Sequence, residues 1–342
     1  MVQHATPPKN TGTARADKQT KATAPVIPTV AATEGLAYFG GNFVPMGEAN
    51  VNVATHGLNY GTGCFEGIRA YWNADHEQLY VLKLREHFER FNRSRRLLRM
   101  QEKESVDELC AITVELLRRQ NFRQDVYIRP LAFKSERTIK LKLSGLEDAM
   151  TVFAFPMGNY VEISAGLHVC ISSWRRVSSN AMPIRGKTTG TYVNSALAAD
   201  EAAAAGYDEA IFLTEGGHVS EGSSCNLFML RKGKLHTPRT ADDILEGITR
   251  EGIMEMAQRE FSLETVERAI DRTELFDADE IFLTGTGVQI APVTRIEGRA
   301  INSGEPGAGT MALQASYLRA ARGDDPRYAD WVTPVYTDGV KA

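Results

Sequence analysis

The chain contains 342 residues, of which 43% are hydrophobic and 24% are charged, and its formal net charge is -4 at pH 7. These values are typical of a soluble globular protein that buries a substantial core, and the length predicts two domains. Basic and acidic residues are interleaved, and no apolar run approaches the roughly 20 residues of a membrane-spanning helix. Neither a nucleic acid nor a membrane is therefore an expected partner.

The four cysteines are far apart and lack the spacing of a metal site or a redox motif; they are Cys64, Cys110, Cys170 and Cys225. We expect reduced thiols, no bound metal and a cytoplasmic location.

Residues 1–34 are rich in Ala, Thr, Pro and Lys and have almost no large apolar side chains. Such a segment cannot offset the entropy lost on ordering, so a flexible leader is expected. A transit peptide is the alternative. It is disfavoured because arginine is scarce, Asp17 is present and no amphipathic period is visible.

In the first half of the chain, the residues predict strands covered by two helices. A Gly-Gly pair within 38–44 predicts a tight hairpin. Helical spacing of apolar residues predicts a helix over 85–100, and the capping box that begins at Ser105 predicts a second helix. Strands are expected at 127–133 and 151–155, followed by a Pro-Met-Gly-Asn break that is typical of a linker.

In the second half, apolar runs alternate with helical stretches, which predicts a mixed α and β domain. Strands are expected at 167–172, 210–213, 226–230 and 281–283, and helices are expected to begin near Tyr192, Thr249 and Thr310. The expected division is a leader over 1–34, a small N-terminal domain over 35–156, a linker over 157–165, a large C-terminal domain over 166–330 and a tail over 331–342. A ligand cleft is expected between the two domains.

Lys187 is the strongest candidate for chemistry. It lies among small residues that leave room for a planar ligand, Tyr192 follows five residues later, and a carboxylate, Glu221, lies further on. A lysine amine can form a Schiff base with a carbonyl compound. The alternative is a solvated surface lysine, which is the common case. Three segments, 85–90, 247–250 and 284–287, are each suited to holding a phosphate through guanidinium or backbone N–H groups.

Further motifs accompany this lysine in a fixed order. They are Tyr60-Gly61-Thr62, Phe65-Glu66-Gly67-Ile68-Arg69, Tyr127-Ile128-Arg129-Pro130-Leu131, Lys187, Ser220-Glu221-Gly222, Asn226-Leu227-Phe228, Gly247-Ile248-Thr249-Arg250 and Gly285-Thr286. From about Gly35 to about Tyr317, the chain closely resembles the class IV (fold type IV) aminotransferases, and within that class the branched-chain amino acid aminotransferases. The resemblance implies an α+β fold of two domains, with a small α/β domain and a larger domain that has a β-barrel-like core. It also implies pyridoxal 5'-phosphate as the cofactor, bound at the domain interface.

The resemblance implies a role for each residue around the cofactor. Lys187 would form the Schiff base and, once released, transfer the proton of the substrate Cα. Glu221 would pair with the pyridine nitrogen and Tyr192 would hydrogen-bond the phenolic oxygen. The remaining cofactor-binding residues would be Arg90, Ile248, Thr249, Gly285 and Thr286. The alternatives are ordinary ones: a solvated loop carboxylate for Glu221, a half-buried helix tyrosine for Tyr192 and an exposed helix arginine for Arg90.

On the substrate side, the resemblance implies an apolar pocket with one arginine, formed by Tyr60, Phe65, Gly67, Tyr127, Arg129, Tyr160 and Gly287. Aromatic walls suit a Leu, Ile or Val side chain, and Arg129 can pair with the second carboxylate of glutamate. Tyr127 and Arg129 share one face of a strand, which favours a cleft lining over core packing.

Two features differ from the family pattern. Met157 stands in the linker where many bacterial relatives have tryptophan, and a flexible thioether forms a less defined wall. Residues 138–144 alternate polar and apolar side chains like a half-buried strand, where the family usually has a glycine-rich loop. In the family this region helps to close the site, in part from a neighbouring subunit. Both differences bear on the amino donor.

The expected activity is amino transfer from leucine, isoleucine or valine to 2-oxoglutarate by a homodimer or a larger oligomer of dimers. Three alternatives keep the same fold: a D-amino acid transaminase, an (R)-amine transaminase and an aminodeoxychorismate lyase. An alternative of another class is a protein that binds the cofactor without turnover.

Overall fold

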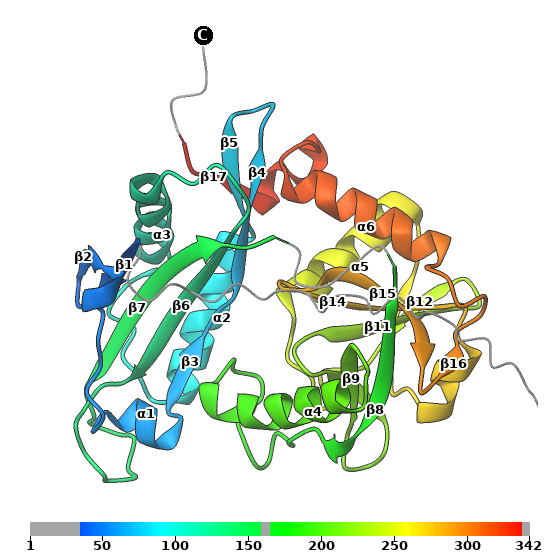
Figure 1. Ribbon diagram of the computed structural model, residues 1–342, viewed down its shortest axis with the longest axis horizontal. Coiled ribbons are helices and arrows are strands. Elements are labelled where there is room, and N and C mark those ends of the chain that lie inside the picture. Colours follow the sequence, from blue (N-terminus) through cyan, green and yellow to red (C-terminus); the bar gives the residue numbers. More distant parts are fainter. Residues whose placement is uncertain (1–34, 159–164, 337–342) are drawn as a thin grey trace, which may run out of the picture.

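The computed structural model describes residues 35–158 and 165–336, which form two β-sheets that lie side by side, each with its own helices (Figure 1). The expectations for the leader, for Tyr160 and for residues 337–342 lie outside the described residues. The two-sheet α+β architecture confirms the predicted fold class.

The first sheet has eight strands and is antiparallel, with the order β17-β5-β4-β6-β7-β1-β2 and with β3 paired to β6. Its strands are β1 (Leu36–Phe39), β2 (Asn42–Pro45), β3 (Gly63–Phe65), β4 (Ile68–Asn73), β5 (Gln78–Leu82), β6 (Val126–Lys134), β7 (Asp148–Pro156) and β17 (Val332–Pro334). The hairpin β1–β2 and the strands β6 and β7 confirm the predicted elements. Strand β4 was not predicted because five of its six residues are buried, so its sequence lacks the alternation of a half-buried strand.

Within residues 35–158, this half of the molecule has three α-helices: α1 (His56–Tyr60), α2 (Leu84–Leu97) and α3 (Val106–Gln120). Helices α2 and α3 confirm the two predicted helices, and the capping box of Ser105 and Glu108 is present at the start of α3. Phe88 and Phe91 of α2 are fully buried in a core that they share with β4, β5 and β6. This packing fixes the face that α2 turns towards the second sheet.

The second sheet has nine strands in the order β10-β9-β8-β15-β14-β11-β12-β13, with β16 paired to β15. Its strands are β8 (Leu167–Arg175), β9 (Glu209–Leu213), β10 (Val219–Gly222), β11 (Asn226–Arg231), β12 (Lys234–Thr237), β13 (Thr265–Glu267), β14 (Glu280–Gly285), β15 (Gln289–Ile296) and β16 (Arg299–Ala300). Three pairs, β8 with β9, β8 with β15 and β12 with β13, are parallel, and the other described pairs are antiparallel. The sheet curls around its own apolar core (Figure 1).

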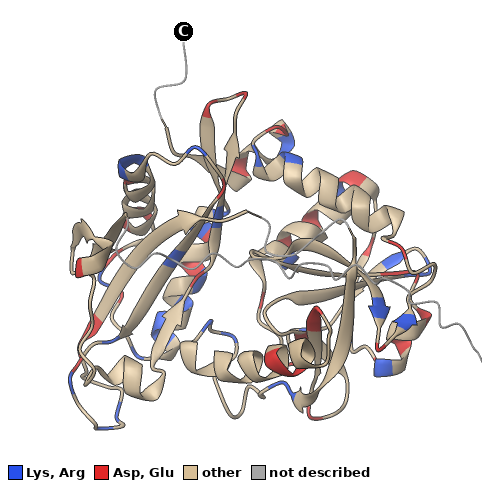
Figure 2. Ribbon diagram, in the orientation of Figure 1, with Lys and Arg blue, Asp and Glu red and all other residues tan. Residues whose placement is uncertain are grey.

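Helices α4 (Tyr192–Ala204), α5 (Ile248–Phe261) and α6 (Ala308–Ala321) cover this sheet and begin where the sequence predicts. Short 3-10 helices occur at η1 (Met46–Glu48), η2 (Thr189–Thr191), η3 (Arg272–Asp277) and η4 (Pro326–Trp331). Basic and acidic residues occur on both halves of the molecule (Figure 2). Within the described residues, no helix is both long and apolar enough to cross a membrane.

Two local predictions differ from the structure. Residues 332–334 do not belong to a tail, because they form β17, which pairs with β5 and closes one edge of the first sheet. Residues 138–144 do not form a strand; Ile139 and Leu141 are 84% and 74% exposed. These residues connect β6 to β7. Because β6 and β7 pair with each other along their whole length, the connecting segment does not lie between them as a strand.

Candidate active site

A cavity of about 590 Å³ lies between the two sheets and is lined by residues from both halves of the molecule. It contains most of the predicted site residues: Phe65, Gly67, Arg90, Tyr127, Arg129, Lys187, Tyr192, Glu221, Ile248, Thr249, Gly285, Thr286 and Gly287. Segments that are far apart in the sequence therefore meet at one place.

Lys187 lies outside helices and strands, just before α4, and its Nζ contacts the hydroxyl of Tyr192, the first residue of that helix. The Nζ also lies 5.0 Å from the centre of the Phe65 ring, and the Phe65 and Tyr192 rings meet edge to face at 4.7 Å. Two aromatic rings thus flank the amine, which lines the cavity. An amine held in this way can attack a carbonyl carbon.

Glu221 is a buried carboxylate near the end of β10, and it lies beside the positive charge of Arg176 at 2.9 Å. Burial raises the pKa of Glu221, and the Arg176 guanidinium opposes that rise. Its Oε2 accepts hydrogen bonds from Asn226 Nδ2 at 2.9 Å and from the Leu245 backbone N–H at 3.1 Å. Oε1 pairs with Arg176 and can accept one more donor, such as the N–H of a protonated ring nitrogen.

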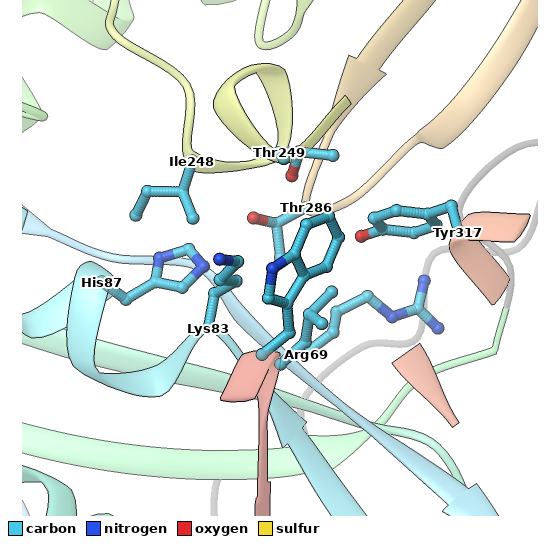
Figure 3. Close-up of a pocket in the computed structure, with 10 residues that line it drawn as sticks. Arg69, Lys83, His87, Ile248, Thr249, Thr286 and Tyr317 are labelled. Atoms are coloured by element: carbon cyan, nitrogen blue, oxygen red, sulfur yellow. The ribbon is translucent and has the colours of Figure 1, made fainter. Parts of the chain in front are cut away.

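The N-terminus of α5, Thr286 and Arg90 form one wall of the cavity, which we call the anion cup. Gly247 is the N-cap residue and no described side chain caps the helix, so the first backbone N–H groups can bind an anion. Figure 3 shows Thr249 and Thr286 next to each other, with Ile248 and His87 close by. These residues also line a second cavity of about 10 Å³ behind the cup, a space for about one water molecule.

Arg90 supplies the positive charge of this cup and is itself held by a buried carboxylate. Its Nε and Nη2 donate to the two oxygens of Glu66 at 2.8 Å, and its Nη1 donates to the Glu246 carbonyl at 2.8 Å. A guanidinium has five N–H groups, so one remains on each terminal nitrogen for a ligand. Burial would raise the pKa of Glu66, but Arg90 and then His87 outweigh burial and lower it to about 2.

On the other side of the cavity, Arg129 lies between two aromatic rings. Its guanidinium carbon is 4.5 Å from the Phe65 ring centre and 5.2 Å from that of Tyr127, and its Nη2 donates to the Tyr127 hydroxyl at 2.9 Å. A Cβ at Gly67 would lie 2.9 Å from Tyr127 Cζ, so only glycine leaves room for this ring. Met157 is buried and lines the same cavity.

Tyr60 does not line the cavity of the single chain. It ends α1, its ring packs against His56 at 4.8 Å, and its hydroxyl donates to the Ile139 carbonyl at 3.0 Å. The left-handed Gly61 that follows turns the chain after the helix, which places Tyr60 at the surface with 40% of its area exposed. The substrate-binding role of Tyr60 therefore stays a prediction, since its side chain does not line the cavity of the single chain.

Sequence reasoning gave no role to the residues that hold these groups in place. Glu66 was part of the recognised Phe65-Glu66-Gly67 motif, and that membership was the one signal for it in the sequence. His87 and Arg176 carry no local signal, because their partners come from other elements of the fold. Asn226 lies in a recognised motif, but its hydrogen bond to Glu221 was not predicted.

Comparison with known proteins identifies the family. The family described as Amino-transferase class IV matches residues 63–296. The chain belongs to this family. A relative from Aquifex aeolicus (strain VF5), "Probable branched-chain-amino-acid aminotransferase", is 45% identical over 300 residues, which is 88% of this chain and 96% of the relative.

Two solved structures support the same assignment. The branched-chain aminotransferase from Thermoproteus uzoniensis with norvaline is 42% identical, with a TM-score of 0.85 over 88% of this chain and 99% of that chain. The branched-chain amino acid aminotransferase from Thermobaculum terrenum in its PLP-bound holo-form is 37% identical, with a TM-score of 0.85 over 90% of this chain and 100% of that chain. The class IV fold predicted from the sequence is thereby confirmed, and so is pyridoxal 5'-phosphate as the cofactor.

Proposed function

We propose that this class IV aminotransferase transfers the amino group of leucine, isoleucine or valine to 2-oxoglutarate. The observation that carries the proposal is the arrangement of one cavity, in which an amine, a buried carboxylate and an anion cup surround a space of about 590 Å³. The similarity to branched-chain aminotransferases over nearly 90% of the chain supports the substrate class.

The residues fit the cofactor at each of its polar groups. Lys187 would bond to the aldehyde carbon, Tyr192 would donate to the phenolic oxygen, and Oε1 of Glu221 would accept from the ring nitrogen. The phosphate would be held by the two free N–H groups of Arg90, the backbone of Ile248, Thr249 and Gly285, and the hydroxyls of Thr249 and Thr286. When bound, the cofactor supplies an electron sink for the carbanion that forms at the substrate Cα.

The protein's own groups would move the proton. Lys187 Nζ, once free, is the base inside the cavity that can take the proton from the substrate Cα and deliver it again. The Tyr192 hydroxyl, in contact with Nζ, keeps the amine directed into the cavity. Glu221, paired with Arg176, would hold the ring nitrogen in its protonated form, which strengthens the withdrawal of electrons from the reacting carbon.

Two kinds of amino donor would share the substrate side. Phe65 and Tyr127 offer apolar surface to a branched side chain, and Met157 adds a flexible wall. Arg129 lines the cavity, and its Nη2 donates one hydrogen bond to the Tyr127 hydroxyl. A guanidinium has five N–H groups, so others can bind a second carboxylate.

We also propose that the chain assembles as a homodimer or a larger oligomer of dimers in the cytoplasm. Large apolar side chains stand exposed: Val53 is 80%, Leu58 63%, Ile139 84%, Leu141 74% and Val193 64% exposed. Such surfaces favour burial against another copy. Sedimentation should give at least a dimer, and Leu141→Asp should weaken the dimer.

The free cysteines fit a reducing compartment such as the cytoplasm, which cell fractionation would test.

The activity is tested by the visible absorption of the purified holoenzyme after addition of L-leucine, D-alanine or an (R)-amine in separate samples. Bleaching of the cofactor band by L-leucine, and its return with 2-oxoglutarate, would support the proposal. Bleaching by D-alanine or the amine alone would assign another substrate class on the same fold. A Lys187→Ala variant that turned over at a normal rate would refute the role of Lys187.

A further inference from the structure

Lys187 is held in place by hydrogen bonds from the other half of the molecule. It has no helix or strand of its own to fix its backbone. Its backbone N–H donates to Ser94 Oγ of α2 at 3.0 Å, and its carbonyl accepts from the Phe65 backbone N–H of β3 at 3.0 Å. The preceding residue, Gly186, lies so close to α2 that a Cβ there would be 2.8 Å from Leu97 Cδ1.

Ser94 belongs to the same helix as the anion-binding Arg90, one turn further on. Its side chain is fully buried, and its hydroxyl donates to the Arg90 carbonyl at 3.0 Å. A hydroxyl has a single proton, so that bond fixes its direction and leaves a lone pair for the Lys187 N–H. One hydroxyl therefore connects the backbone of the phosphate-binding arginine with the backbone of the reactive lysine.

We propose that Ser94 is a positioning residue that sets the distance between the cofactor's phosphate and the attacking amine. This inference rests on the proposed role of Lys187. With the phosphate held by Arg90, the Nζ must reach the aldehyde carbon. The C=N bond then forms, and the aldehyde oxygen leaves as water with the two amine protons. Loss of the Ser94 hydroxyl leaves the Lys187 N–H unpaired and frees the loop to shift.

Two ligands separate a positioning role from a general structural one. Pyridoxal 5'-phosphate forms the covalent bond to Lys187. Pyridoxamine 5'-phosphate has the same ring and phosphate but carries an amine in place of the aldehyde, so it cannot form that bond. A defect in Lys187 placement weakens only the first ligand, whereas a distorted α2 or Arg90 weakens both.

The experiment compares the affinity of apoenzymes for both ligands, by absorbance for pyridoxal phosphate and by calorimetry for pyridoxamine phosphate. We expect Ser94→Ala to bind pyridoxal phosphate roughly tenfold more weakly, the usual effect of one lost buried hydrogen bond, and to form the C=N bond more slowly. Its affinity for pyridoxamine phosphate should stay within about twofold of the wild type. Ser94→Cys fills the same space with a weak acceptor and should resemble Ser94→Ala.

Thr113 provides a matched control. It is also fully buried, and its hydroxyl donates to the Leu109 carbonyl one turn earlier at 2.9 Å, but it lies in α3 and does not line the cavity. Thr113→Ala should leave both affinities unchanged. Equal loss of both affinities in Ser94→Ala, or loss of neither, would overturn the proposal.

Lys187→Ala distinguishes failure of this proposal from failure of the proposed function. If Lys187→Ala abolishes the preference for pyridoxal phosphate while Ser94→Ala preserves it, only the positioning role of Ser94 is refuted, and the proposed role of Lys187 stands. If Lys187→Ala keeps the wild-type preference, Lys187 is not the covalent residue, and both proposals fail.

Discussion

Replacing Glu66 by glutamine tests the buried ion pair that holds Arg90. Glu66 is fully buried, and its oxygens accept hydrogen bonds of 2.7–2.8 Å from His87 and Arg90. Although burial opposes ionisation, these partners lower its pKa from 4.5 to about 2. At about 1.4 kcal/mol for each tenfold change in proton affinity, the ionised group stabilises the fold by about 3 kcal/mol. Glutamine keeps the shape but leaves the buried guanidinium without a countercharge.

The pH dependence of this effect has a definite sign. Because the pKa of Glu66 is lower in the folded chain, its ionised form stabilises the fold fully above about pH 4.5, and this contribution is lost as the pH falls through about 2. The difference in free energy of unfolding between wild type and Glu66→Gln should therefore be constant from about pH 8 to 5 and shrink below about 4.5. Burial lowers the pKa of His87, which disfavours its charged form in the folded protein.

The assay is urea unfolding of the two apoenzymes, followed by tryptophan fluorescence at pH 7 and at pH 5. Glu115→Gln is the control, because Glu115 pairs with Arg119 at 2.7 Å on the surface and should contribute well under 1 kcal/mol. Adding inorganic phosphate should restore more stability to Glu66→Gln than to the wild type, since the anion supplies the missing charge at Arg90. A difference below about 1 kcal/mol at pH 7, or one that already falls between pH 7 and 5, would refute the reasoning.

Three further substitutions test the assignment of roles. Glu221→Gln should bind pyridoxal phosphate but slow the half-reaction with L-leucine by roughly 100-fold, measured by stopped-flow absorbance, because the ring nitrogen loses its anionic partner. Arg129→Gln should raise KM for 2-oxoglutarate more than about tenfold and change KM for leucine by less than about threefold in steady-state assays, because only the diacid needs the guanidinium. Gly67→Ala should displace the Tyr127 ring, with which its Cβ would collide, and raise KM for both substrates while the cofactor absorbance stays unchanged.

The sequence predicted the elements whose signals are local. The start of α3 followed from the capping box of Ser105 and Glu108, which needs only four consecutive residues. Strand β17 was missed because its three residues become a strand only by pairing with β5, far earlier in the chain; the neighbouring hydrogen bond from Val335 N to Gln78 Oε1 spans 257 positions. Residues 138–144 have the pattern of a strand but pair with none of the described strands, which shows that alternation alone does not make a strand.

The same distinction explains what was found and missed in the active site. In the proposed reaction Lys187, Tyr192 and Glu221 would act on the cofactor, so their chemical types and order along the chain carry the signal. The groups that hold them act on other protein atoms, and any residue of suitable polarity at the right place in space can do so. Ser94 bonds to Lys187 across 93 positions of the sequence, and nothing in the residues around either one specifies that contact. Most buried hydroxyl and carboxylate groups have hydrogen-bond partners, so the contacts of such groups next to a reactive side chain show the positioning residues that sequence motifs leave out.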